Sequence, residues 1–190
     1  MGCLLACAAS FIRTVVVGFK DVEPQGAGAR APAVTDTLKG AGETIVMPLK
    51  GPLIALEDVD DKVFSSGVVG QGVAIVPEDG ALYSPMDGYV ANTFEGGHAI
   101  GLRSDAGAEI LIHIGIDTVQ LQGEHFTLHV EEGQRIAAGQ LLIEFNIEAI
   151  QQAGYQLVTP VVITNAEAYQ RVAPLPVKQQ QPGEPIIMLT

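Results

Sequence analysis

Residues 110–117 read ILIHIGID, a run in which isoleucine occupies every second position and a histidine stands in the middle. Side chains two residues apart in a β-strand lie on the same face. The four isoleucines therefore form one apolar face, which we predict to be the core face. His113 lies on the opposite face together with Gly115 and Asp117. Gly115 has no side chain, which leaves room for a partner to approach the imidazole of His113.

The rest of the chain from Thr44 onward consists of short, β-branched apolar runs separated by turn signals such as Asp87-Gly88, Gly96-Gly97 and Glu132-Gly133. A spacing of about ten residues between turns is typical of all-β sandwiches and barrels. Only residues 146–154 and 166–172 have a helical pattern, and each is long enough for two turns at most. The sequence therefore predicts an antiparallel, all-β sandwich or barrel-like domain with one or two short helices.

A weak internal repeat supports this prediction. The segment MPLKGPLI (residues 47–54) resembles SPMDGYVA (residues 84–91), with a proline and a glycine at matching positions. The later segment VEEGQRIAAGQLLIEF (residues 130–145) has the same kind of glycine turn between strands. We therefore expect two related β units that face each other.

The composition restricts the classes of function. The chain has 190 residues, of which 47% are hydrophobic, so that one domain with a tail and a sizeable core is expected. Its formal net charge of -12 argues against nucleic acid, because affinity for a phosphate backbone depends on cationic side chains. The same charge attracts a basic protein partner. Both cysteines, Cys3 and Cys7, lie in the first ten residues, so no disulfide framework is expected and a reducing compartment fits.

The first 43 residues differ from the rest. Residues 1–20 are apolar, but Arg13 divides them into pieces too short to span a bilayer, and the basic start of a signal peptide is missing. We interpret them as a remnant or a surface helix. Residues 21–43 are rich in Gly, Ala and Pro without an apolar period, which is typical of a flexible linker. The folded domain is expected over residues 44–190.

Four histidines are candidates for chemistry. His113 has either a structural role, with its ring bonded to the backbone, or a chemical one. His98 follows two glycines and precedes an apolar strand, so that turn amides beside it can bind an anion such as phosphate. A solvated turn histidine is the simpler alternative. His125 and His129 flank an exposed connection, and we predict them to be surface residues.

Three classes of function are compatible with two histidines on a β scaffold. A phosphoryl carrier needs a neutral imidazole as nucleophile and a second group that stabilises the phosphoryl charge. A zinc hydrolase needs three protein ligands and an open position. The spacing of His113 and Asp117 matches the H-x3-D motif of lysostaphin-like zinc peptidases, but no two histidines here form the H-x-H pair of those enzymes. A non-catalytic binding module needs none of these groups.

From Thr44 to Thr190 the chain resembles the glucose-type IIA domain of the bacterial phosphoenolpyruvate-dependent sugar phosphotransferase system. The matching text is GHAIGLRSDAGAEILIHIGIDTVQLQGEHFTLHVEEGQRIAAGQLLIEFN from Gly97, followed by LVTPVVITN and GEPIIMLT. This resemblance implies a compact phosphotransferase domain with a duplicated β motif and no required cofactor. Its expected partners are the histidine phosphocarrier protein, which donates the phosphoryl group, and a IIB domain, whose cysteine accepts it.

The resemblance also implies roles for individual residues. His113 matches the phosphorylated histidine, His98 the neighbour that hydrogen-bonds the phosphoryl group, and Asp117 the acidic residue beside the site. An apolar rim that docks partners is implied at Phe64, Val69, Phe94 and Leu111. We expect Asp117 to point toward a partner or a backbone donor, because a carboxylate on the attacking nitrogen would favour the protonated, unreactive ring.

One residue departs from the family pattern. Members commonly have threonine two residues before the neighbouring histidine, where this chain has Gly96. A water or a backbone group is then expected to orient His98 instead of the threonine hydroxyl. The resemblance further implies that His98 and His113 help to bind zinc at the interface with a regulated partner, and that the domain works in the cytoplasm, at the inner face of the membrane with its permease.

Overall fold

The computed structural model of the chain describes residues 42–176 and 180–190, which form mostly β-strands joined by short helices. The strands are β1 (Glu43–Val46), β2 (Leu53–Ala55), β3 (Gln71–Ile75), β4 (Ala81–Tyr83), β5 (Gly88–Thr93), β6 (Ala99–Ser104), β7 (Glu109–His113), β8 (Phe126–Leu128), β9 (Arg135–Ile136), β10 (Leu141–Phe145), β11 (Thr159–Ile163), β12 (Val172–Pro174) and β13 (Pro185–Leu189). The helices are α2 (Lys62–Ser65) and α3 (Ile147–Gln152), and 3-10 turns are η1 (Leu56–Asp58), η2 (Thr118–Leu121) and η3 (Ala166–Ala168). The predicted N-terminal segment 1–20 and the linker up to residue 41 lie outside the described residues.

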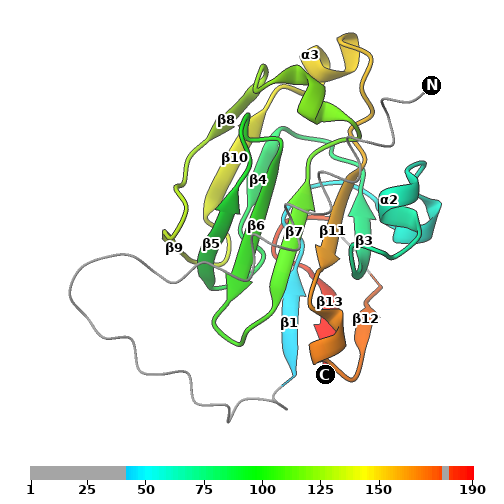
Figure 1. Cartoon of the computed structure of the whole chain (residues 1–190), viewed down its shortest axis with the longest axis vertical. Helices are drawn as coiled ribbons and strands as arrows, with labels where there is room; N and C mark the ends of the chain where they lie inside the picture. The colour runs from blue at the N-terminus through cyan, green and yellow to red at the C-terminus, as the bar shows by residue number, and fades with distance from the viewer. Residues whose placement is uncertain (1–41, 177–179) are drawn as a thin grey trace.

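The strands form a large sheet and two small ones. The large sheet has the order β2-β3-β11-β7-β6-β5-β9, and Figure 1 shows β11, β7, β6 and β5 side by side in the front layer. The small sheets have the orders β1-β13-β12 and β4-β10-β8. All strand pairs in the three sheets are antiparallel. The architecture is an open sandwich of separate sheets, and the prediction of an antiparallel all-β fold is confirmed.

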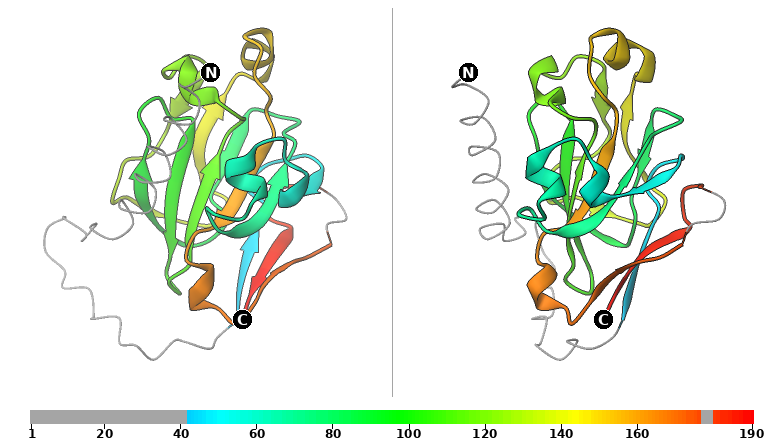
Figure 2. Two further views of the ribbon diagram at one scale, coloured as in Figure 1. Left: turned by 45° about the vertical axis from the view of Figure 1, so that its right-hand side comes forward. Right: turned by 90° about the vertical axis from the view of Figure 1, so that its right-hand side faces the viewer.

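The main core lies between the large sheet and the two small sheets, which lie on one side of it in the right-hand view of Figure 2. The large sheet contributes Ile100, Ile110 and Ile112, and the small sheets contribute Ile143 and Ile187, all without exposed surface. Burial of each such side chain stabilises the fold by about 1.5–3 kcal/mol before the loss of conformational entropy is counted. The even-numbered residues of β7 therefore face the main core, as the sequence predicted.

The other face of the large sheet is also covered. Leu111 of β7, Ala74 of β3 and Val162 of β11 are buried there beneath a second apolar cluster from residues 56–69, which includes α2. We call this the outer cluster, and its buried members are Leu56, Val59, Phe64, Val69, Ala74, Leu111 and Val162. The sheet next to His113 is thus apolar on both faces.

The internal repeat is visible in the backbone hydrogen bonds. Val46 N donates to Pro85 O at 3.0 Å, and Tyr83 N donates to Pro48 O at 2.8 Å, so each copy of the repeat bonds to the other at equivalent positions. The backbone N–H and C=O of Met47 both form hydrogen bonds with the turn before β13. Those of Ser84 form the equivalent two bonds with the turn before β10. The two related units face each other, as the sequence predicted.

The helix predictions were only partly right. Residues 147–152 form α3, and the Asn146 side chain caps it by accepting from Ala149 N. Residues 166–168 form a single 3-10 turn, because Tyr169 is extended and ends it before β12 begins at Val172. Helix α2 was missed, since four residues are too few to show a period. Its start is marked by Asp61, whose carboxylate accepts from Val63 N and Phe64 N.

The strand containing His113 ends earlier than the alternation predicted. Strand β7 stops at His113, and Gly115 has a φ of +76°, which breaks the period of two. Ile114 still reaches the main core, whereas Ile116 packs against the outer cluster instead. The prediction that all four isoleucines share the core face is therefore wrong for Ile116, and the glycine is the physical cause.

Candidate functional site

His113 is the last residue of β7 and is held by the turn that follows. The residue is 5% exposed, and its Nδ1 lies 2.7 Å from the carbonyl oxygen of Gly115. A carbonyl only accepts, so Nδ1 carries the proton, and in the neutral ring Nε2 is then the nitrogen with the lone pair. The nucleophilic atom of this imidazole is therefore Nε2.

The turn after His113 has little freedom. A Cβ atom at Gly115 would lie 2.6 Å from the carbonyl oxygen of Gln156 and 2.6 Å from Cγ2 of Thr118. The Thr118 hydroxyl donates to Ile114 O, and Ile116 N donates to Gln156 O at 2.9 Å. These contacts fix the direction of the Gly115 carbonyl, and with it the orientation of His113.

His98 lies beside His113, one residue before β6. The ring centroids are 5.2 Å apart, and the rings cross at 68°. A backbone hydrogen bond also links the two segments, since Ile114 N donates to His98 O at 2.8 Å. His98 is 3% exposed, and its Nε2 is buried without a hydrogen-bond partner among the described residues. Its backbone partner is Glu95, so Nδ1 makes that bond, and Nε2 is left to meet a ligand.

Burial controls the electrostatics of this pair. It lowers the pKa of His98 to about 4, with a further decrease from the neighbouring His113 and a smaller opposing effect of the Glu95 carbonyl. Burial also lowers the pKa of His113 to about 4, and the bond to Gly115 opposes it only in part. Both rings are therefore neutral at pH 7, the state in which an imidazole nitrogen can act as a nucleophile.

Two phenylalanines contact the histidines. The Phe64 ring centroid is 5.5 Å from that of His113, and the Phe94 centroid is 6.2 Å from that of His98. Phe64 belongs to the outer cluster, and Phe94 packs against it while partly buried. This apolar surrounding explains why the rings are desolvated.

The residues that the resemblance implied for a docking rim occupy different depths. Phe94 is partly exposed, and Phe64 and Val69 are 5% and 7% exposed. Leu111 has no exposed surface, so it supports the other three from beneath. Sequence reasoning missed Val68 and Val119, which are 66% and 43% exposed. Their large exposed aliphatic surface, next to Val69 and close to Asp117 in the chain, is visible only in the structure.

Asp117 is exposed and adopts a left-handed conformation with a φ of +58° at the start of η2. Non-glycine residues in this region are uncommon, and aspartate is among those that tolerate it best. The conformation turns the chain sharply after the His113 strand and places the carboxylate at the surface.

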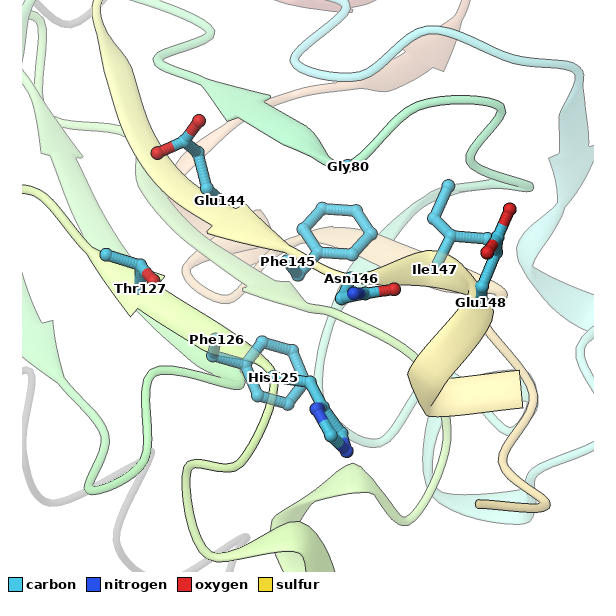
Figure 3. A pocket seen from close by; sticks show the side chains of 9 residues that line it. All are labelled: Gly80, His125, Phe126, Thr127, Glu144, Phe145, Asn146, Ile147 and Glu148. Carbon is cyan, nitrogen blue, oxygen red and sulfur yellow. The ribbon is translucent and has the colours of Figure 1, made fainter. Parts of the chain in front are cut away.

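The other two histidines lie on the surface, as predicted. His129 Nε2 is 2.6 Å from Glu144 Oε2 in an exposed pair. His125 lines an open hollow of about 620 Å³ beside β8, β10 and α3, shown in Figure 3 with Phe126, Phe145 and Glu148 around it. Neither histidine is brought to His113, so the site is formed by His98 and His113.

Within residues 42–176 and 180–190, no group of three or more His, Cys, Asp or Glu side chains could hold a metal ion. The two histidines alone are too few for a structural or catalytic zinc site. In the same part of the chain, no helix has the length and apolar character needed to cross a membrane.

The fold and the histidine pair define a class of protein, the β-sandwich phosphoryl carriers that work through a phosphohistidine. Residues 43–169 match the family described as phosphoenolpyruvate-dependent sugar phosphotransferase system, EIIA 1. The chain therefore belongs to this family of phosphotransferase system components. The zinc peptidase and the non-catalytic module are not favoured.

Individual relatives agree with this assignment. The whole chain is 44% identical to the beta-glucoside-specific EIIBCA component of Bacillus subtilis, of which it covers 30%, and 46% identical to that of Dickeya chrysanthemi, of which it covers 31%. The glucose-specific EIIA component of Bacillus cereus is 45% identical over 68% of this chain and 79% of that protein. The structure of glucose permease IIA from Mycoplasma capricolum superposes with a TM-score of 0.69 at 30% identity, over 77% of this chain and 95% of that one. The chain thus spans about a third of the first two relatives.

Proposed function

We propose that Nε2 of His113 accepts a phosphoryl group from the histidine phosphocarrier protein and passes it to a cysteine of a IIB domain. The observation that carries this proposal is the bond from Nδ1 of the buried His113 to Gly115 O, which leaves the lone pair on Nε2. We assign this work to a domain of residues 44–190, and the family match over residues 43–169 supports the assignment.

The transfer exchanges one nitrogen–phosphorus bond for another. The lone pair of Nε2 attacks phosphorus in line with the donor nitrogen, whose bond to phosphorus breaks and whose ring keeps the electron pair. Positive charge develops on the His113 ring as the new bond forms. The Gly115 carbonyl accepts from Nδ1 and stabilises that charge at a distance of 2.7 Å. The second transfer reverses these roles, with a cysteine thiolate as the attacking group.

His98 stabilises the phosphoryl oxygens. Because its Nδ1 bonds to Glu95, its neutral ring has no proton on Nε2 and can donate from that atom only as an imidazolium. A phosphoryl dianion on His113 favours the charged form of a neighbouring base and so raises the pKa of His98. Phosphorylation is therefore coupled to proton uptake by His98, which then donates to the phosphoryl group.

The apolar surroundings protect the phosphohistidine. Phe64 contacts His113, and Phe94 contacts His98, so water has little access to the ring pair from these sides. A partner that covers the exposed surface completes the exclusion of water and limits hydrolysis. Phe64, Val69 and Phe94 form the apolar rim of this docking surface, backed by Leu111.

Asp117 contributes charge to the same surface. It is exposed beside the site, and the whole chain has a net charge of -12. Both features favour a partner with a basic docking surface and increase the rate of encounter. Asp117 thereby acts on the partner and the site electrostatics.

Relatives that are named EIIBCA components support a IIB domain and a membrane permease as further partners. The domain then works on the cytoplasmic side of the membrane, at its permease. Phosphoryl transfer needs no cofactor. His98 and His113 supply two imidazole ligands for a zinc ion only if a partner supplies the others at an interface.

Incubation with phosphoenolpyruvate, enzyme I and the phosphocarrier protein, followed by intact-mass analysis, tests the proposal. The wild-type chain is expected to gain one acid-labile phosphoryl group, and His113→Gln none. His98→Gln is expected to accept the group and to pass it on slowly to a IIB domain. His129→Gln is the matched control, because this histidine lies on the surface away from the site.

Uptake of a phosphoryl group by His113→Gln would refute the assignment of the acceptor. A wild-type chain that gains none, while a known IIA domain in the same mixture does, would refute phosphoryl transfer itself. Equal transfer rates to a IIB domain from His98→Gln and wild type would remove the role of His98.

A further inference from the structure

The turn that precedes His98 has an unusual requirement for glycine. Gly97 N donates to Phe94 O at 2.8 Å, which closes a four-residue turn over residues 94–97. Gly96 is the third residue of this turn and has a φ of +90°. A positive φ at the third position is the mark of a type II turn, in which glycine is favoured there.

The turn type determines where the Glu95 carbonyl points. Types I and II differ mainly by a rotation of the central peptide, which joins the second and third residues. That peptide carries the Glu95 carbonyl, the same group that bonds to His98. A change from type II to type I would rotate this carbonyl toward the opposite side of the turn and remove the hydrogen-bond partner of Nδ1.

Packing against a second loop restricts Gly96 further. A Cβ atom at Gly96 would lie 2.7 Å from Gly123 N and 3.0 Å from Gly123 Cα. Gly123 has a φ of +94°, and its own Cβ would lie 3.0 Å from Gly96 Cα. The two glycine backbones touch between the turn before β6 and the loop before β8, so Gly96 has no room for a side chain and Gly123 has very little.

We propose that Gly96 is a positioning residue for phosphoryl transfer, because its left-handed conformation against Gly123 aims the Glu95 carbonyl at Nδ1 of His98 and so presents Nε2 to His113. This proposal rests on the role of His98 described above. Any L-residue at position 96 must change the turn or displace the loop of Gly123. A changed turn leaves the ring of His98, which is 3% exposed, without the carbonyl that fixes its tautomer and orientation. A displaced Gly123 loop removes the packing that holds the turn in place.

The proton on His98 shows why this matters for transfer. With Nδ1 held by Glu95, Nε2 keeps the lone pair and can take up the proton that the phosphoryl group attracts. If the Glu95 carbonyl turns away, the ring can rotate or bind its proton on Nε2 in the neutral state. Phosphoryl uptake by His113 depends less on the His98 ring than the later transfer to a IIB domain does. The reason is that Gly115 fixes the orientation of the His113 ring.

The first test needs no variant. In a long-range ¹⁵N–¹H spectrum of the wild-type chain at pH 7, the ring of His98 is expected to be the neutral tautomer with its proton on Nδ1. A ring with the proton on Nε2, or a mixture of the two tautomers, would overturn the proposal whatever the variants do.

The second test compares Gly96→Ala with Gly107→Ala. Gly107 also has a positive φ, +102°, but a Cβ there meets nothing within 4 Å, so this variant controls for backbone strain alone. Gly96→Ala is expected to lose the single Nδ1–H tautomer of His98 and to transfer its phosphoryl group to a IIB domain at least about tenfold more slowly. Gly107→Ala is expected to keep both. Gly123→Ala, which presses on the same contact from the other loop, is expected to show the same kind of change as Gly96→Ala.

The readouts separate this proposal from the proposed function. If Gly96→Ala keeps the wild-type tautomer and transfer rate, Gly96 is not a positioning residue, although uptake by His113 stands. If Gly96→Ala slows transfer no more than Gly107→Ala does, strain explains the effect, and the proposal is likewise overturned. If the wild-type chain takes up no phosphoryl group, the proposed function fails, and the tautomer measurement still reports whether Gly96 orients His98.

Discussion

Nδ1 of His113 lies 2.7 Å from the carbonyl oxygen of Gly115, two residues further along the chain. This local bond fixes the tautomer of a buried imidazole, and no carboxylate is needed to do so. A neutral acceptor keeps the ring uncharged at pH 7 while it directs the lone pair to Nε2. A charged acceptor in the same place would raise the pKa of the ring and favour the protonated state.

Gly115→Ala is expected to damage the acceptor site. A Cβ at φ +76° costs about 1–3 kcal/mol in backbone strain, and it would collide with Gln156 O. Unfolding in urea should show this loss, and phosphoryl uptake by His113 should slow because the Gly115 carbonyl moves. Gly139→Ala is the control, since Gly139 has a φ of +79° and open space around it. Equal loss of uptake in both variants would contradict the role of the Gly115 carbonyl.

Thr118→Val is expected to loosen the same turn. Thr118 is fully buried, and its hydroxyl donates to Ile114 O. Its replacement by a methyl group leaves that carbonyl unsatisfied and should lower the free energy of unfolding by about 1–3 kcal/mol. Thr118→Ser keeps the hydroxyl and is expected to retain more of the uptake rate by His113, even though it loses a buried methyl group. If the valine variant takes up phosphoryl at least as fast as the serine variant, the hydrogen bond does not position the site.

The fold was predictable because its signals are local. Alternating isoleucines, glycine turns and the repeat of two proline-glycine segments each identify strands and their connections without knowledge of distant contacts. The end of β7 was not predictable in this way. ILIHIGID continues to alternate past His113, and only the positive φ of Gly115 shows where the strand stops and why Ile116 leaves the core face.

The candidate site was predictable in its residues but not in its geometry. The sequence identified His98 and His113, whereas their contact across β6 and β7 depends on the register of two strands. The burial of the site residues could not be predicted either, because both faces of the large sheet are covered and Leu111 is buried rather than exposed. A helix of four residues, α2, supplies Phe64 against His113, and no periodic signal reveals so short an element.

Glu43→Gln is expected to alter how stability depends on pH. Burial raises the pKa of Glu43 above the usual value of 4.5, although Ser104 donates to its carboxylate. A raised pKa in the folded chain adds stability below pH 4.5, and this stability is lost as pH rises through the folded pKa. The glutamine variant has no such titration, so its stability relative to wild type should increase from pH 4 to pH 7 in urea unfolding. Glu124→Gln, at an exposed position, serves as the control. A difference that is the same at both pH values would contradict the prediction.

The neutral histidine pair predicts that acid destabilises the domain. The folded pKa values of His98 and His113, about 4, lie below the ordinary value of 6.5. Between these values the unfolded chain binds protons that the folded chain does not, so stability is full above pH 6.5 and falls as pH drops toward 4. An NMR titration of the ring resonances should show both histidines neutral at pH 5.5, and the same rings in the urea-unfolded chain mostly protonated. Protonation of either ring near pH 6.5 in the folded chain would contradict the expected desolvation.

Phosphorylation of His113 should raise the pKa of the His98 ring, in opposition to the effect of burial. A phosphoryl dianion on His113 lies close to the ring of His98, since the ring centroids are 5.2 Å apart, and it favours the imidazolium of His98. An opposite charge at such a distance raises the pKa of a base by about 1–3 units. The same NMR titration of the phosphorylated chain should therefore show His98 taking up its proton at a higher pH than in the unphosphorylated chain. His113→Gln, incubated with the same donors, controls for effects of the mixture. If His98 in the phosphorylated chain titrates as it does without the phosphoryl group, proton uptake is not coupled to transfer, and the phosphoryl oxygens must be stabilised by backbone amides of the turn instead.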